Sequence, residues 1–189
     1  MQVDYAVELG SDDETLEFPW SAPEGGPRYF DLKQDPDALR NIEEAQRELE
    51  LRDFLTKLNG PDSILESAKC DVWSSGEIHP EEEIFGLPWK FGSYVDIVFS
   101  GVAERSSFES HENVLKKLCD LLKRAPDIPA SAEFLLRHCY FRQSDGMQTG
   151  FYVTFYLFGF GEDEEAAHRQ WGIALRLVGN AMRQVGMGR

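Results

Sequence analysis

Long apolar runs are absent from this sequence. No segment approaches the roughly 20 apolar residues that a membrane-spanning helix needs, and the longest apolar run lies within residues 150–160. The first 30 residues also lack the basic start and apolar stretch that mark a secretory signal peptide. We therefore expect a cytoplasmic protein that has no membrane partner.

Cysteine and basic residues are also scarce. Cys70, Cys119 and Cys139 form an odd and scattered set, which fits reduced thiols better than a disulfide framework. The 19 Lys and Arg residues face 34 Asp and Glu residues, so the net charge is −15. A negative field of this kind repels phosphate backbones and anionic lipids. It excludes nucleic acid as an expected partner and suits a basic protein or a small cationic ligand.

The usual catalytic and metal-binding motifs are missing as well. The sequence has no His-Glu-x-x-His, no paired Cys-x-x-Cys and no Asp-rich calcium loop. The Gly-x-Gly at residues 159–161 lacks a third glycine, and the acids at 162–165 would repel a phosphate there. His138 adjoins Cys139, but neighbours on a strand point to opposite faces and cannot form a dyad. We expect no resident cofactor.

The clearest structural signal is an aromatic strand that runs into a long helix. Residues 150–160 are rich in aromatic and β-branched side chains, which predicts a strand ended by Gly159 and Gly161. Neither face of this strand is polar, so we expect it to be central or to meet a partner. Apolar residues then recur at steps of three and four, which predicts an amphipathic helix that stops near Gly186. The stripe consists of Ala167, Trp171, Ala174, Val178, Ala181 and Val185.

The rest of the chain predicts further strands and two more helical segments. The expected strands are 2–9, 28–33, 64–74, 91–100 and 131–142. Asp35-Pro36 marks one helix start, and a capping box from Ser106 to Glu109 marks another. The apolar stripe of the first helix shifts near Glu50, so we expect a bend or two helices there. Ser144-Asp145-Gly146 predicts a tight hairpin turn.

This order gives a strand-strand-helix unit three times. We predict a single α+β domain over 1–189, with about six mainly antiparallel strands and three helical segments on one face of the sheet. Residues 92–97 align with residues 150–155, which suggests an internal repeat of 62–125 in 130–186. Chance similarity is the alternative, because strands favour few residue types.

Two long acidic loops, 10–27 and 75–90, are the best candidates for a site. Each carries a Pro-Trp pair, and loops of this length are uncommon unless they are functional or mobile. We predict that Trp20 and Trp89 line a ligand pocket. The acids expected to meet a cation are Glu17, Glu81, Glu82 and Glu83. The alternative is that both tryptophans fill the ends of the core while the acids are solvated.

These features support two functions. The leading hypothesis is a non-catalytic binding or regulatory module for a basic protein or cationic ligand. The alternative is a small hydrolase, with or without a divalent metal, that uses His79, Glu81–Glu83 and His111; the two histidines are weak candidate metal ligands.

The second face of the aromatic strand raises a separate expectation. If helices cover only one side of the sheet, Tyr152, Tyr156 and Phe158 need another cover. A homodimer, a long loop or the remaining helical segment are the covers that we consider.

Overall fold

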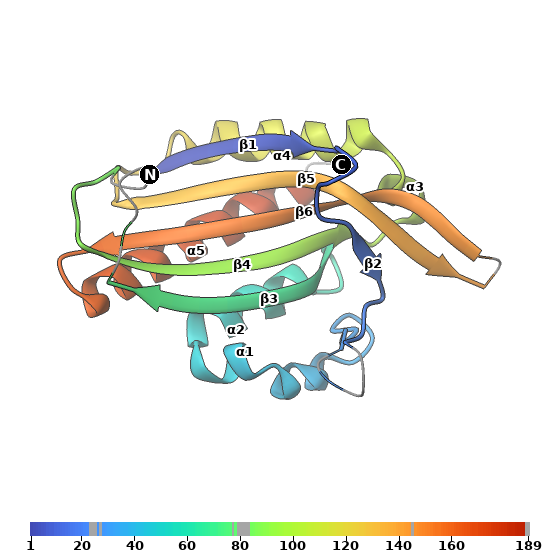
Figure 1. The fold of residues 1–189 in the computed structure, drawn as a ribbon, viewed down its shortest axis with the longest axis horizontal. Coiled ribbons are helices and arrows are strands. Elements are labelled where there is room, and N and C mark those ends of the chain that lie inside the picture. Colours follow the sequence, from blue (N-terminus) through green and yellow to red (C-terminus); the bar gives the residue numbers. More distant parts are fainter. Residues whose placement is uncertain (23–25, 27, 77, 79–83, 145, 188–189) are drawn as a thin grey trace.

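The chain forms one sheet with helices packed against one of its faces (Figure 1). The computed structural model describes residues 1–22, 26, 28–76, 78, 84–144 and 146–187. The strands are β1 Gln2–Glu8, β2 Leu16–Phe18, β3 Leu65–Ser75, β4 Trp89–Phe99, β5 Ala130–Gln143 and β6 Gly146–Gly161. The helices are η2 Pro36–Asn41 (a 3₁₀ helix), α1 Glu43–Arg47, α2 Leu49–Leu58, α3 Val102–Arg105, α4 Phe108–Leu122 and α5 Glu164–Met187.

The strand order is β1-β5-β6-β4-β3, and β2 also pairs with β5. The central pairs β5–β6, β6–β4 and β4–β3 are antiparallel, whereas β1 and β2 run parallel to β5. The predicted α+β class, the six strands and the helices against the sheet are therefore confirmed. Among the described residues, no helix combines the length and apolarity that crossing a bilayer requires.

In the first predicted unit, the strand at 2–9 is confirmed as β1, but the second strand is wrong. Residues 28–33 form no strand, and β2 lies inside the segment expected to be a loop. Asp31 explains part of this difference, because its carboxylate accepts hydrogen bonds from the backbone N–H groups of Lys33 (3.1 Å) and Gln34 (3.0 Å). Such a side-chain turn competes with strand pairing. β1 and β2 then add separately to one edge of β5.

The last two units do follow the predicted order. β3-β4-α4 and β5-β6-α5 each form a hairpin followed by a helix, while a common origin for them stays a prediction. The α4 N-cap is Ser107, whose side chain accepts from the Ser110 N–H at 3.1 Å, and not the predicted Ser106. The helical segment before β3 breaks at Glu48, close to the predicted change near Glu50.

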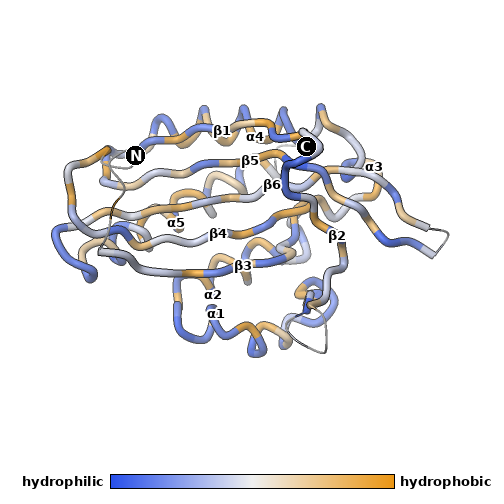
Figure 2. The backbone as a smooth tube through the Cα atoms, in the orientation of Figure 1, coloured by the Kyte–Doolittle hydropathy of each residue, from blue (hydrophilic) through white to orange (hydrophobic). Residues whose placement is uncertain are grey.

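The main core lies between the sheet and the helices. Trp171 of α5 is fully buried and donates its indole N–H to Ser93 Oγ at 2.8 Å. A Cβ built on Gly159 would lie 2.2 Å from the Trp171 backbone nitrogen, so this glycine permits α5 to cross directly over β6. Figure 2 shows hydrophobic and hydrophilic positions interleaved along α4 and α5, as expected for helices with one buried face.

A second, smaller core covers one end of the helix-free face. It joins β2 to the ends of β3, β4, β5 and β6, and it includes Tyr152, which is 2% exposed. Its members are Leu16, Phe18, Ala68, Val98, Cys139, Phe141 and Tyr152. Figure 1 shows the segment between β1 and β2 passing in front of the sheet to reach this end. A long loop therefore supplies the cover that Tyr152 needs.

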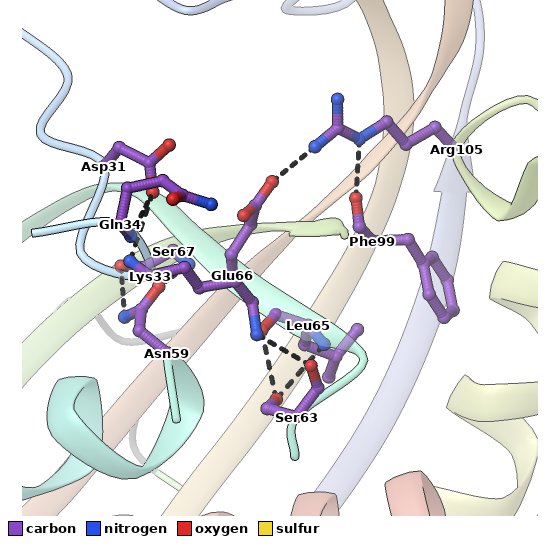
Figure 3. A network of polar contacts seen from close by, with 10 residues as sticks. All are labelled: Asp31, Lys33, Gln34, Asn59, Ser63, Leu65, Glu66, Ser67, Phe99 and Arg105. Carbon is purple, nitrogen blue, oxygen red and sulfur yellow. Dashed lines mark hydrogen bonds and ion pairs between the residues drawn. The ribbon is translucent and has the colours of Figure 1, made fainter. Parts of the chain in front are cut away.

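A polar network fixes residues 31–34, which follow the first long loop (Figure 3). The Lys33 ammonium donates to the carbonyls of Gly60 (3.0 Å) and Ser63 (2.7 Å). Nearby, Arg105 pairs with the buried carboxylate of Glu66. The Lys33 contacts tie the chain after the first long loop to the α2–β3 corner, and the Arg105–Glu66 pair joins α3 to β3.

Candidate binding face

The helix-free face carries a band of four aromatic side chains. Alternation along each strand places Trp73 of β3, Tyr94 of β4, and Tyr156 and Phe158 of β6 on the side opposite the core residues. All four are half-buried, and we call them the aromatic band. Ring centroids lie 5.9 Å apart for Trp73–Phe158, 6.0 Å for Tyr94–Tyr156 and 6.4 Å for the stacked Tyr156–Phe158 pair. The rings form one continuous surface across three strands.

Gly92 makes the close packing of this band possible. It faces Trp73 across the β3–β4 pair and Phe158 across the β4–β6 pair. A Cβ built on Gly92 would lie 2.8 Å from the indole of Trp73 and 3.0 Å from the ring of Phe158. Any side chain at this position would push the two rings away from the sheet.

Beside the band, a polar row crosses the same face. Arg137 of β5 forms ion pairs with Glu8 (2.7 Å) and Glu14 (3.0 Å) and donates to Thr154 Oγ1 at 3.3 Å. Thr154 in turn donates its hydroxyl to Asp96 Oδ1 at 2.7 Å. Burial raises the pKa of the Asp96 carboxyl to about 6, against the lowering effects of this hydrogen bond and of the Lys69 charge.

Two cavities border the band. The first cavity has a volume of about 840 Å³ and lies beside β3; Tyr94 of the band lines it. Its other lining residues include Trp20, Arg28, Glu43, Glu44, Lys69 and Asp71. The second cavity has a volume of about 620 Å³ and is lined by Phe158 of the band. Its other lining residues include Asp4, Ile84, Lys90, Lys123, Glu133 and Phe160. The aromatic band therefore runs from one cavity to the other.

The structure does not bring the two predicted tryptophans together. Trp20 is half-buried, lines the first cavity and donates its indole N–H to the Ala68 carbonyl at 2.6 Å. Trp89 begins β4 opposite Gly161, at the other end of the sheet. At about 3.3 Å per residue, the two side chains lie on the order of 20 Å apart along the strands. Trp89 also packs against the main core on the helix side of the sheet, whereas Trp20 packs against the second core on the helix-free face, so the two do not share a pocket.

The predicted acids are only partly placed. Glu17 lies on β2 with its side chain exposed, 3.7 Å from Arg142, and it lines neither cavity. Glu81, Glu82, Glu83 and His79 lie outside the described residues. Their proposed roles stay predictions.

His111 lies in the core and points away from the candidate face. It is 1% exposed, its ring packs edge-on against Phe99 (4.6 Å) and Phe151 (5.7 Å), and its Nδ1 lies 2.8 Å from the Ser107 carbonyl oxygen. Burial lowers its pKa. A histidine enclosed in this way stabilises the packing of α4 and is poorly placed to bind a metal from solution.

Another group of residues has the composition of a metal site. Glu48, Glu50 and His168 offer ligand atoms that all lie within 4.8 Å of one another. His168 Nε2 lies 2.7 Å from Glu48 Oε2, and Arg176 lies 3.7 Å from Glu50. The His168–Glu48 hydrogen bond and the Arg176–Glu50 ion pair join α5 to the start of α2, and these contacts account for the grouping.

No protein-family model, curated protein or solved structure matches the chain. The face must therefore be interpreted from its own chemistry. It offers aromatic rings and carboxylates, which attract cations. The thiols are poor nucleophiles, because burial raises the pKa of Cys70 and of Cys139 to about 12 and that of Cys119 to about 11.

Sequence reasoning missed most of this face. The alternation in β6 did indicate that Tyr156 and Phe158 would need cover, but Trp73 and Tyr94 join them only through the strand register. The signal for the polar row was the presence of Asp96 and Thr154 inside two otherwise apolar strands.

Proposed function

We propose that this protein is a non-catalytic binding module that holds a basic segment of a partner protein on its helix-free face. The aromatic band carries this proposal. Four large rings stay half-buried on a sheet face that no helix of the described residues covers. Contiguous aromatic surface of this kind is typical of interaction sites.

Charge favours a basic partner over an acidic one. The whole chain carries a net charge of −15, which steers cationic segments towards it and repels anionic ones. At the first cavity, the acids Glu43, Glu44 and Asp71 outnumber the bases Arg28 and Lys69. Lysine and arginine side chains also bind favourably over aromatic faces, so one ligand class suits both the rings and the acids.

The arrangement of the band suits an extended peptide. Trp73, Tyr94 and Tyr156 lie on three neighbouring strands, which are about 4.8 Å apart. A segment that crosses the strands can therefore contact successive rings and end in a cavity on either side. We place this binding in the cytoplasm, where the three thiols would stay reduced.

The test is a titration with short peptides rich in lysine and arginine, followed by fluorescence anisotropy. Analogues with glutamine at every basic position are the ligand controls. We expect the basic peptides to bind, with affinity that falls as salt rises. The double variant Tyr156→Ala/Phe158→Ala should weaken binding by about tenfold or more. Ile173→Ala is the matched control, because Ile173 is an exposed apolar residue on α5.

Three results would overturn the proposal. Equal binding of basic and glutamine peptides would remove the role of charge. An equal loss in the Ile173→Ala variant would place the binding surface elsewhere. A stable dimer in sedimentation that dissociates in the Tyr156→Ala/Phe158→Ala variant would show that a second copy covers the band.

A further inference from the structure

The first cavity contains a cation seat that one of the chain's own lysines occupies. The Lys69 ammonium lies 5.6 Å from the ring centroid of Trp20 and 5.8 Å from that of Tyr94. Both rings line the first cavity. An ammonium within about 6 Å of two aromatic faces has the geometry of a cation–π contact. The two rings therefore form a seat that selects positive charge.

The seat is held in place from both sides. Trp20 is fixed by its indole hydrogen bond to the Ala68 carbonyl at 2.6 Å. Tyr94 is a residue of β4, paired with Asp71 on one side and Tyr156 on the other. Because both rings are anchored, the seat does not need to form when a ligand arrives, which lowers the cost of binding.

Acidic side chains outnumber basic ones around the seat. Glu43, Glu44 and Asp71 line the same cavity, where Arg28 is the one cation besides Lys69 among the described lining residues. The pKa of the Tyr94 hydroxyl is raised by burial first and then by the charges of Asp96 and Asp71. A cation that leaves the seat is therefore replaced most favourably by another cation.

The Lys69 side chain can leave its position beside the rings of Trp20 and Tyr94. Its side chain is exposed, and it lies at the irregularity between Ser67 and Lys69 in the β3–β4 pairing. Trp20, by contrast, is held by its hydrogen bond to β3. Displacing Lys69 needs a rotation of a flexible side chain into solvent, and it gives up the two ring contacts and the charge interaction with Asp96.

We propose that Lys69 is a placeholder, and that the ammonium group of a lysine in the bound peptide displaces it and takes its seat between Trp20 and Tyr94. This inference rests on the proposed function and names the side chain that the first cavity recognises. It makes Lys69 an internal competitor. Removing the competitor must therefore strengthen binding of a basic ligand.

Two substitutions of Lys69 distinguish the effect of emptying the seat from the effect of losing one positive charge. Lys69→Ala and Lys69→Met each remove one positive charge, so both change the long-range field equally. Only Lys69→Ala empties the seat, because a methionine side chain is long enough to stay between the rings. Circular dichroism and thermal unfolding of each variant check that the fold is retained.

The probe is a peptide with one central lysine among uncharged residues, with a norleucine analogue as control. Isothermal titration calorimetry measures the affinity. The nuclear magnetic resonance signal of the Trp20 indole N–H reports whether the seat is occupied. We expect Lys69→Ala to bind the lysine peptide about tenfold more tightly than the unsubstituted protein. Lys69→Met should gain much less. The gain should disappear in the double variant Lys69→Ala/Trp20→Ala and with the norleucine peptide.

The outcomes distinguish this inference from the proposed function. Equal gains in affinity for Lys69→Ala and Lys69→Met would mean that only the net charge matters. This result would overturn the placeholder role of Lys69. Weaker binding by Lys69→Ala would also overturn it, since Lys69 would then contact the ligand. In both cases the proposed function stands if the Tyr156→Ala/Phe158→Ala variant still loses affinity. No binding to any of these proteins would overturn both.

Discussion

Replacing Asp96 by asparagine should change how stability depends on pH. Asp96 is 7% exposed, and burial raises the pKa of its carboxyl from 3.8 to about 6. The folded protein therefore keeps this proton up to about pH 6, whereas the unfolded chain releases it near pH 4. Between these values the folded state binds more protons, so this group lowers stability as pH rises.

The size of the effect follows from the two pKa values. Each unit of pKa difference corresponds to about 1.4 kcal/mol, so a rise from 3.8 to about 6 corresponds to about 3 kcal/mol. Asparagine does not titrate and can still accept the hydrogen bond that Thr154 donates at 2.7 Å. The difference in free energy of unfolding, Asp96→Asn minus the unsubstituted protein, should therefore increase by about 3 kcal/mol as the pH rises from about 4 to about 7.

Urea unfolding followed by tryptophan fluorescence at several pH values measures this difference. Asp71→Asn, which removes an exposed carboxylate from the same face, corrects for the general loss of one negative charge. A difference between Asp96→Asn and the unsubstituted protein that stays flat with pH would refute the reasoning. A difference that decreases as the pH rises would show that Lys69 and Arg137 stabilise the charged carboxylate more than burial disfavours it.

Two further predictions concern buried groups outside the aromatic band. Arg105→Ala should lower the free energy of unfolding by about 3 kcal/mol, because it leaves the Glu66 carboxylate buried without its partner. The exposed Arg142→Ala should change it by less than about 1 kcal/mol in the same denaturant titration; equal losses would contradict this account. Cys119 and Cys139 should react with a thiol reagent only in denaturant, since burial raises their pKa values. Rapid reaction of the folded protein would show that they are accessible.

The sequence predicted best the elements with strong local periodicity. The aromatic alternation of β6 and the apolar stripe of α5 each extend over many residues, so their positions were close to those observed. β2 has only three residues, and its pairing with residues 139–141 of β5 is specified by contacts far away in the chain. No local pattern could distinguish it from the loop around it, or show that residues 28–33 would turn instead.

The candidate face depended on long-range register in the same way. The loop that follows β3 connects it to β4 at one end of the sheet, whereas the loop between β1 and β2 lies at the opposite end. Trp20 and Trp89 were therefore separated by the topology, which the sequence did not reveal. Asp96 and Thr154 became neighbours only because β4 and β6 pair in one particular register.

The most direct test of the binding face is a nuclear magnetic resonance titration of the labelled protein with a lysine-rich peptide. The account predicts that signals of Trp73, Tyr94, Tyr156 and Phe158 shift together, and that the signal of Ile173 on α5 does not. Shifts that cluster on α4 and α5, with the signals of the aromatic band unchanged, would contradict it.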